Sequence, residues 1–354
     1  MSRNKRVILH IGMLKTGTTS LQSYLQRRCD ALSEQGVGCY IQQYSPHATW
    51  ANAGFLCWQS VFDARGNGDK LPNSMEEMEL FAEYAKGYDT LILSEEFLWE
   101  MGIEEAGFWS AVKRNIHRLV GEDAQIDIIV FLRRQDDWIL SRWKERLLSW
   151  PHREHADFSD YLERMEKMGH MDYDVALERI AQVFGREHIT VCSYGRKDGK
   201  KIDTTKTFLT AIGMRLAPLE KTEMIFGNTS ISMRAAKAIL DINRRDEDDV
   251  VASRKKIVRA TRIFSSMYPD EEQYYPMKRE ERIAFLSRFN DINNSVSLEY
   301  KHGEELFEKE ISDYSLWNDN PEQSEMDANR ILKIASISDD TMTLLHQQLM
   351  ALRH

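Results

Sequence analysis

The chain has 354 residues, of which 42% are hydrophobic and 10% aromatic, so it can bury a sizeable core and does not belong to the disordered class. Its net charge of −9 argues against a general nucleic-acid-binding protein, which needs a basic surplus to contact phosphates. No apolar stretch has the length of a membrane helix, and the first residues lack the pattern of a signal peptide. We therefore expect a soluble cytoplasmic protein without a transmembrane segment.

Apolar strand patterns alternate with amphipathic helix patterns over the first two thirds of the chain. Val7–Ile11 is a continuous apolar run of the kind found in buried parallel strands. This alternation predicts an α/β fold in which helices flank a parallel β-sheet and ligands bind at the carboxyl ends of the strands. Further strands are predicted at 37–41, 90–93, 126–132 and 188–193, and helices at 18–29, 75–86, 105–119, 136–149 and 173–184.

From about Leu216 onward the sequence contains only helix patterns, at 254–262, 279–300 and 340–352. We therefore predict an α/β core over residues 1–215 and a mainly helical C-terminal extension, 216–354, that packs on it. The segment 42–73 has no clear periodicity, and a loop of that length in a compact domain is usually functional or disordered.

Residues 12–19, G-M-L-K-T-G-T-T, resemble a phosphate loop whose lysine has moved. The version that binds nucleoside triphosphates reads G-x-x-x-x-G-K-[ST]. Here Gly12 and Gly17 have the correct separation, but Thr18 takes the place of the lysine, and the loop's lysine is Lys15. Backbone N–H groups of residues 15–19, at the positive end of the following helix, predict an anion site over which Lys15 can reach. The alternative is an ordinary strand-to-helix turn with a threonine cap.

A second cluster of polar residues follows the strand predicted at 126–132. Arg133 stands at the end of that strand, and Ser141 lies eight residues further on, about two turns into the next helix. An arginine fork and a serine hydroxyl can both bind a phosphate monoester. The alternative interpretation is a local network of ion pairs and caps among Arg134, Asp136 and Asp137.

Together, the two motifs resemble the nucleotide-binding motifs of sulfotransferases that use 3′-phosphoadenosine 5′-phosphosulfate (PAPS), and most closely those of bacterial and carbohydrate-type members. The resemblance runs from Val7 to about Met214 and implies a P-loop-like fold. One position departs from it, because many related bacterial loops carry histidine where this chain has Leu14. In this resemblance the 5′-phosphosulfate loop corresponds to Lys15, Thr16, Gly17, Thr18 and Thr19, and the 3′-phosphate motif to Arg133 and Ser141.

The resemblance also implies the chemistry of a sulfotransferase. Lys15 would stabilise the bridging oxygen that gains charge as the sulfuryl group leaves, which requires no metal ion. A base must take the proton of the acceptor. In carbohydrate sulfotransferases a glutamate in a comparable place often does so, and the pattern S-x-E favours Glu96 over its neighbour Glu95. The alternatives are a cap or surface role for either glutamate and His47 as the base. His10 lies within the first strand and is expected to be a hydrogen-bonded core residue.

The sequence therefore predicts an enzyme that transfers a sulfuryl group from PAPS to a hydroxyl or amine, on a small molecule or glycan. A phosphate-loop kinase and a non-catalytic nucleotide-binding scaffold remain as alternatives. The kinase would need magnesium and a lysine beside the second loop glycine. No pattern in the sequence identifies the acceptor or the oligomeric state. A basic run at 254–262 could receive an acidic polysaccharide, or it could be a solvated face that balances the acidic residues just before it.

Overall fold

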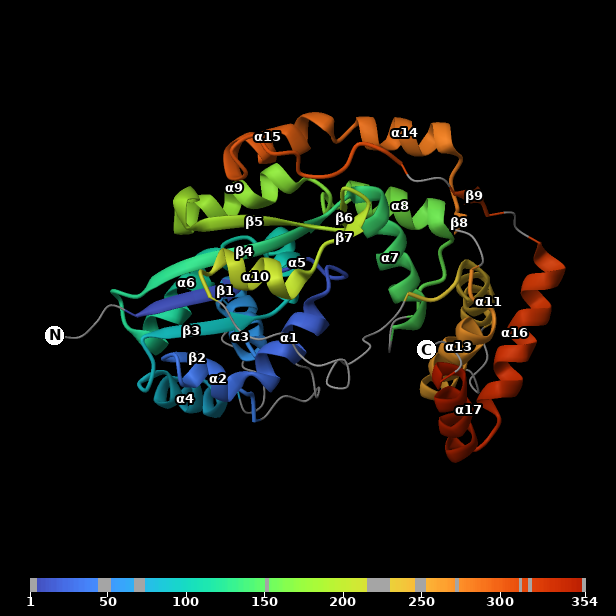
Figure 1. The fold of residues 1–354 in the computed structure, drawn as a ribbon, viewed down its shortest axis with the longest axis horizontal. Helices are drawn as coiled ribbons and strands as arrows, with labels where there is room; N and C mark the ends of the chain where they lie inside the picture. The colour runs from blue at the N-terminus through green and yellow to red at the C-terminus, as the bar shows by residue number, and fades with distance from the viewer. Residues whose placement is uncertain are drawn as a thin grey trace. The chain divides into compact units, whose positions relative to one another are not determined.

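The chain forms two compact units, each made of three separate segments, in the computed structural model (Figure 1). The first unit comprises residues 1–134, 169–227 and 289–309, and the second comprises 135–168, 228–288 and 310–354. The predicted domain boundary at residue 215 falls outside the described residues and stays a prediction. The structure describes residues 5–43, 52–66, 74–149, 153–214, 230–245, 253–270, 274–311, 314–317 and 320–351.

A parallel sheet of five strands forms the centre of the first unit, in the order β2-β3-β1-β4-β5. Because β3 and β4 flank β1, the loop that leaves β1 begins beside the carboxyl ends of two other strands. The predicted α/β class is confirmed. The bounds of each predicted strand differ by at most two residues from those of the observed strand. The strands are β1 (Arg6–His10), β2 (Val37–Cys39), β3 (Thr90–Ser94), β4 (Gln125–Arg133) and β5 (Ile189–Tyr194).

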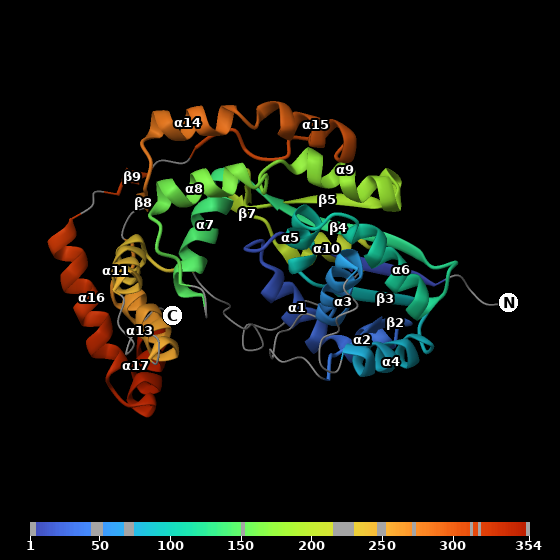
Figure 2. The same ribbon diagram turned by 180° about the vertical axis from the view of Figure 1, so that it is seen from behind.

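Helices cover both faces of this sheet (Figures 1 and 2). One face carries α1 (Thr18–Arg27), α2 (Cys29–Ser33) and α10 (Thr204–Ala211). Beyond β5, a short hairpin of β6 (Arg196–Lys197) and β7 (Lys200–Lys201) leads into α10. The remaining helices of the unit are α3 (Gly54–Arg65), α4 (Ser74–Ala85), α5 (Phe97–Glu104), α6 (Phe108–Val120), α9 (Tyr173–Phe184) and α15 (Asn290–Tyr300).

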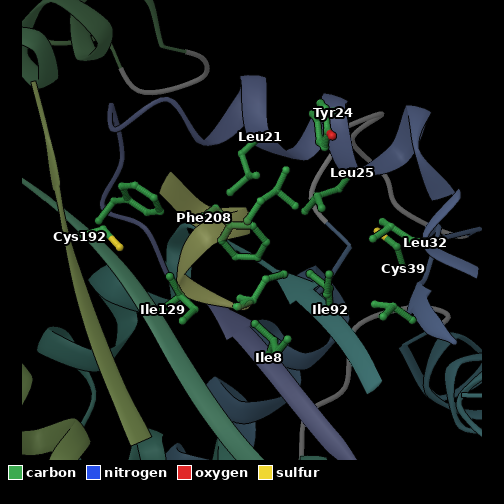
Figure 3. Close-up of a cluster of buried hydrophobic side chains, with 14 residues drawn as sticks. Ile8, Leu21, Tyr24, Leu25, Leu32, Cys39, Ile92, Ile129, Cys192 and Phe208 are labelled. Atoms are coloured by element: carbon green, nitrogen blue, oxygen red, sulfur yellow. The ribbon is translucent and has the colours of Figure 1, made fainter. Parts of the chain in front are cut away.

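The face that carries α1 and α10 has an apolar core, shown in Figure 3. Ile8 and Ile129 contribute from the sheet, Leu21 and Leu25 from α1, and Phe208 from α10. All five side chains are buried, and at most 2% of any one is exposed. Because interiors pack as densely as organic crystals, this core holds the start of α1 firmly against the sheet.

Helix α3 lies within the segment 42–73, which showed no periodicity in the sequence. Its buried residues include Phe55, Leu56 and Cys57, followed by Gln59, Ser60 and Val61, so they extend around most of the helix rather than along one stripe. A helix buried on several sides does not produce the 3.6-residue pattern by which amphipathic helices are found. The long-loop interpretation was therefore wrong for residues 54–65.

The second unit is mainly helical, as predicted for the C-terminal part of the chain. The predicted helix at 279–300 is in fact two helices, α14 in the second unit and α15 in the first. Among the described residues, no helix is long and apolar enough to cross a membrane. The elements of the second unit are α7 (Gln135–Leu148), α8 (Phe158–Lys167), α11 (Met233–Arg244), α13 (Arg254–Met267), β8 (Tyr274–Tyr275), α14 (Arg279–Ser287), β9 (Ser315–Leu316), α16 (Pro321–Ala335) and α17 (Asp339–Ala351).

A buried ion pair in the second unit joins α7 to α14. Arg282 lies 2.6 Å from Asp136, with both side chains fully buried, and it also lies 3.1 Å from Asp137. The guanidinium group of Arg282 stacks on the ring of Tyr275, 4.0 Å from its centroid. Asp136 and Asp137 therefore do form an ion-pair network, but their partner comes from a helix far along the chain.

Candidate active site

The loop between β1 and α1 has the backbone geometry of an anion site. Lys15 and Gly17 both have positive φ, 71° and 79°, on either side of Thr16. Such alternation turns successive N–H groups toward one side and makes a concavity that suits an anion. The first turn of α1 starts at Gly17, whose carbonyl oxygen accepts from the amides of Ser20 and Leu21. The amides at the very start of the helix have no partner within it, and they lie at the positive end of its dipole.

Gly12 allows side chains to pack closely beneath this loop. A Cβ atom at Gly12 would lie 2.8 Å from His10 Nε2 and 2.9 Å from Thr18 Cγ2, which is too close for a larger residue. Thr16 is fully buried, and its Oγ1 donates to the carbonyl oxygen of Met13 at 2.6 Å. The first glycine and the first threonine of the motif therefore fix the path of the loop, whereas the amides line its concave side.

Glu96 contacts the loop directly. Its carboxylate accepts a hydrogen bond from the hydroxyl of Thr18, the residue that stands where a kinase has its lysine. Glu96 occupies the cap position of α5, yet its side chain caps no amide of that helix. The cap role instead belongs to Glu95, whose Oε1 accepts from the amide of Phe97 at 3.1 Å. The interpretation of Glu96 as a helix-cap carboxylate is therefore wrong.

Glu95 faces a different part of the unit. Its Oε2 lies 3.4 Å from the place that a Cβ atom at Gly54, the first residue of α3, would occupy. Burial raises the pKa of Glu95 from 4.5 to about 7, against the opposing effect of hydrogen bonds from the amides of Phe97 and Glu96. The two neighbouring carboxylates thus differ in environment, one buried toward α3 and one bonded to the loop.

Arg133, at the carboxyl end of β4, holds the other side of the loop. Its Nη1 donates to the carbonyl oxygen of Lys15 at 3.0 Å, and its guanidinium group lies 5.4 Å from the centre of the Tyr194 ring. The hydroxyl of Tyr173 donates to the backbone oxygen of Arg133 at 2.7 Å. Hydrogen bonds therefore connect Arg133, at the end of β4, to Tyr173 of α9 and to Lys15 of the loop.

His10 is part of a polar network in the core below the loop. The ring is fully buried, its Nδ1 lies 2.8 Å from Ser94 Oγ, and Gln22 Nε2 donates to the same oxygen at 3.1 Å. Asn52 Oδ1 accepts from the amide of Ser94 at 2.6 Å and completes the network. Burial lowers the pKa of His10 from 6.5 to about 3, so the ring is neutral at physiological pH. This confirms the expectation of a hydrogen-bonded core histidine.

The structure brings the loop, Glu96 and Arg133 together at the carboxyl ends of β1, β3 and β4. Thr19 lies in the first turn of α1 and is half-buried. Ser141 is buried on α7 and belongs to the second unit. His47 lies outside the described residues. Within the part of the chain that is described, no group of three or more His, Cys, Asp and Glu residues could hold a metal ion.

Several residues around the site were missed from the sequence. Gln22 lies one helical turn after Thr18, and this spacing was the signal that could have placed it on the inner face of α1. Ser94 belongs to the S-x-E pattern, but nothing in that pattern predicts its contact with His10. Asn52 carried no signal, because its contact with Ser94 joins segments 42 residues apart. Tyr194 and Thr204 both pack against Gly17, and only the return of the chain to the loop after β7 brings Thr204 there.

No family model matches the chain. An uncharacterized protein from Archaeoglobus fulgidus is 29% identical over 196 residues, which are 53% of this chain and 50% of that protein, so the match spans about half of each. A crystal structure of a sulfotransferase from Alicyclobacillus acidocaldarius is 16% identical and covers 84% of this chain and 96% of its own, with a TM-score of 0.38. A TM-score this low does not establish a shared fold.

Proposed function

We propose that this protein is a sulfotransferase that transfers a sulfuryl group from PAPS to a hydroxyl or amine. The observation that carries the proposal is the hydrogen bond between Thr18 of the loop and the Glu96 carboxylate. This contact supports the proposal, because a carboxylate next to a loop whose geometry suits an anion is the arrangement needed for transfer to an acceptor that must lose a proton. The sequence resemblance to sulfotransferases supports the same assignment.

The loop and Arg133 fit the two charged ends of the co-substrate. The amides of residues 15–19, with the hydroxyl of Thr19, would bind the 5′-phosphosulfate end. We assign the 3′-phosphate to Arg133. The part of Ser141, which belongs to the other unit, stays a prediction from the sequence motif. The Arg133 fork has five donors, and the contact with the Lys15 carbonyl oxygen uses one of its nitrogens. When bound, the co-substrate supplies the sulfuryl group.

Lys15 and Glu96 have opposite roles in the transfer. Glu96 takes the proton of the acceptor as the acceptor oxygen or nitrogen forms its bond to sulfur. Lys15 stabilises the bridging oxygen of the 5′-phosphate, which keeps the electron pair of the breaking sulfur–oxygen bond. The positive charge of Lys15 makes a metal ion unnecessary for this step. Thr18 holds the Glu96 carboxylate against the loop and so fixes the base relative to the anion site.

The acceptor in this proposal is a small molecule or a glycan. Sugars offer both hydroxyl and amine groups, so the proposed chemistry applies to O- and N-sulfation alike. Glu96 would serve either type of acceptor, because in both cases a single proton must leave the attacking atom.

A thermal-shift comparison tests the proposal. Adenosine 3′,5′-bisphosphate without added metal should stabilise the protein by about 2.7 kcal/mol at 100 times its dissociation constant. ATP with magnesium should stabilise it much less, because it lacks the 3′-phosphate assigned to Arg133. The reverse order would favour the kinase. Tight bisphosphate binding without transfer of labelled sulfate to any of a panel of sugars, phenols and amines would favour the non-catalytic scaffold.

A further inference from the structure

Residues 196–201, which we name the basic hairpin, concentrate positive charge on an exposed ribbon. β6 and β7 pair antiparallel, so that Arg196 lies opposite Lys201 and Lys197 lies opposite Lys200. All four side chains are exposed. The turn residues Asp198 and Gly199 both have positive φ, 53° and 71°, as a tight two-residue hairpin turn requires.

These cross-strand pairs oppose the stability of the hairpin. Side chains directly opposite on antiparallel strands are about 5 Å apart at Cβ, and like charges at such positions are destabilising. The chain as a whole has a net charge of −9, so an excess of basic residues in the sequence does not explain two like-charged pairs on one short ribbon. An anion bound between the paired cations would remove the repulsion.

Acidic side chains of the same unit compensate only part of this charge. Lys197 lies 3.8 Å from Glu304, and Glu308 accepts from the amide of Gly199 at 3.1 Å. Arg196 donates to the carbonyl oxygen of Gly199 at 2.7 Å. Among the described residues, neither Arg196 nor Lys201 forms an ion pair with an acidic side chain. The pair formed by Arg196 and Lys201 therefore has the larger uncompensated charge.

The basic hairpin is attached to the candidate site at both ends. Tyr194 precedes it and Thr204 follows it, and both pack against Gly17 of the loop. A Cβ atom at Gly17 would lie 3.0 Å from Tyr194 Cε2 and 2.9 Å from Thr204 Oγ1. The chain therefore contacts the loop at Tyr194, at the end of β5, forms the hairpin, and contacts the loop again at Thr204, at the start of α10. Arg196 comes two residues after Tyr194 and Lys201 three residues before Thr204, so these two cations stay within about 10 Å of chain from the anchors.

We infer that the basic hairpin binds negatively charged groups of the acceptor, and therefore that the acceptor is an anionic molecule. This inference rests on the proposed sulfotransferase function. The two charged ends of the co-substrate are assigned above to the loop with Lys15 and to Arg133, so the uncompensated pair of Arg196 and Lys201 is left for a second anion. Carboxylate, phosphate or sulfate groups on the acceptor would bind across the pair of Arg196 and Lys201 and bring its hydroxyl or amine toward the loop.

The test compares two polymers with the same backbone, carboxymethyl dextran and unmodified dextran, both fluorescently labelled. Binding is measured by anisotropy at low and at moderate salt with saturating adenosine 3′,5′-bisphosphate. Wild-type protein should bind the charged polymer at least about tenfold more tightly than the neutral one, and added salt should weaken this binding. The double variant Arg196→Gln, Lys201→Gln should lose about tenfold in affinity for the charged polymer while its affinity for the bisphosphate stays within about twofold.

The matched control is Lys167→Gln, Lys333→Gln, which removes two exposed charges from α8 and α16 of the second unit, outside the basic run 254–262. It should leave both affinities unchanged. Equal losses in the two double variants, or equal binding of both polymers, would overturn the inference. A tenfold loss of bisphosphate affinity in the hairpin variant would assign the hairpin to the nucleotide instead. Bisphosphate binding without polymer binding would reject the hairpin's role alone, whereas wild-type protein that binds no bisphosphate would reject the sulfotransferase and the acceptor assignment together.

Discussion

Arg133 Nη1 donates to the carbonyl oxygen of Lys15 at 3.0 Å, so the end of β4 holds the one loop position at which a side-chain-bearing residue has a left-handed backbone. Such a conformation costs about 1–2 kcal/mol for most residues and persists only where the surroundings enforce it. The arginine proposed to bind the nucleotide therefore also maintains the shape of the loop.

Replacement of Arg133 by alanine should weaken binding of adenosine 3′,5′-bisphosphate by about 1.5–3 kcal/mol, because charged hydrogen bonds are lost. Isothermal titration calorimetry measures the change. The neighbouring Arg134 is the matched control, since its Nη1 donates to the carbonyl oxygen of Glu308 rather than to the loop. Arg134→Ala should bind the bisphosphate normally, and equal affinities in the two variants would remove Arg133 from the site.

Lys15→Ala should lower turnover about 100-fold or more while bisphosphate affinity stays within about tenfold, because Lys15 acts mainly on charge that develops during transfer. Alanine has a Cβ atom, as lysine does, so the free-energy cost of positive φ at position 15 is the same in both proteins. The comparison therefore reports on the loss of the lysine side chain with its ammonium group. Lys15→Arg should also be poor, because a planar fork does not replace a compact ammonium group. Steady-state kinetics with labelled PAPS provide the measurement, and near-normal turnover of Lys15→Ala would exclude the role in stabilising the leaving group.

Glu96→Gln should lower turnover by a factor of about 100 to 10,000 with little change in stability or bisphosphate affinity. The glutamine carbonyl oxygen can still accept the hydrogen bond of Thr18, so the loop keeps its shape while the base is lost. Parallel Glu95→Gln and His47→Asn variants show whether the effect is specific. Full turnover by Glu96→Gln would leave His47 as the next candidate base.

Glu95 should make stability depend on pH. Its pKa is raised from 4.5 to about 7, so the folded protein binds an extra proton between these values and the free energy of unfolding falls as pH rises through that window. Glu95→Gln removes this ionisation and should lose less stability than wild type between pH 5 and pH 8. Melting temperatures at both pH values measure the difference. The exposed Glu34→Gln serves as control and should follow wild type, and a Glu95→Gln profile parallel to wild type would contradict the raised pKa.

Asp136→Asn should destabilise the second unit by about 3–5 kcal/mol, because it leaves the fully buried Arg282 without its closest counter-charge. Asp137 remains 3.1 Å from Arg282 but is one-third exposed, so it compensates only partly. Chemical denaturation followed by tryptophan fluorescence gives the loss. The exposed Asp340→Asn should cost less than about 0.5 kcal/mol, and a similarly small cost for Asp136→Asn would mean that the pair adds little to stability.

Much of the first unit could be predicted because its signals are local. The strands β1, β3 and β4 are continuous apolar runs, and the glycine spacing of the loop reflects two separate constraints, close packing beneath Gly12 and positive φ at Gly17. Arg133 was placed correctly at a strand end for the same reason. The left-handed backbone of Lys15 had no signal in the sequence, since lysine has no preference for it.

The features that were missed depend on distant parts of the chain. The pairing of Asp136 with Arg282 spans 146 residues, and no periodicity reports such a contact. The different surroundings of Glu95 and Glu96 arise because β3 ends at Ser94, so strand alternation does not decide where either side chain lies. The division into units was also hidden, because α14 and α15 form one continuous helical pattern in the sequence.

The interleaved segments of the two units have a consequence for synthesis on the ribosome. The first unit includes residues 289–309, and its helix α15 packs against α9 and β5, which were made more than 90 residues earlier. Until α15 emerges, the apolar surface that it covers stays exposed while most of the second unit is being translated. The nascent chain must therefore keep an incomplete sheet from associating with other chains, and a fragment that ends near residue 215 would remain permanently in that state.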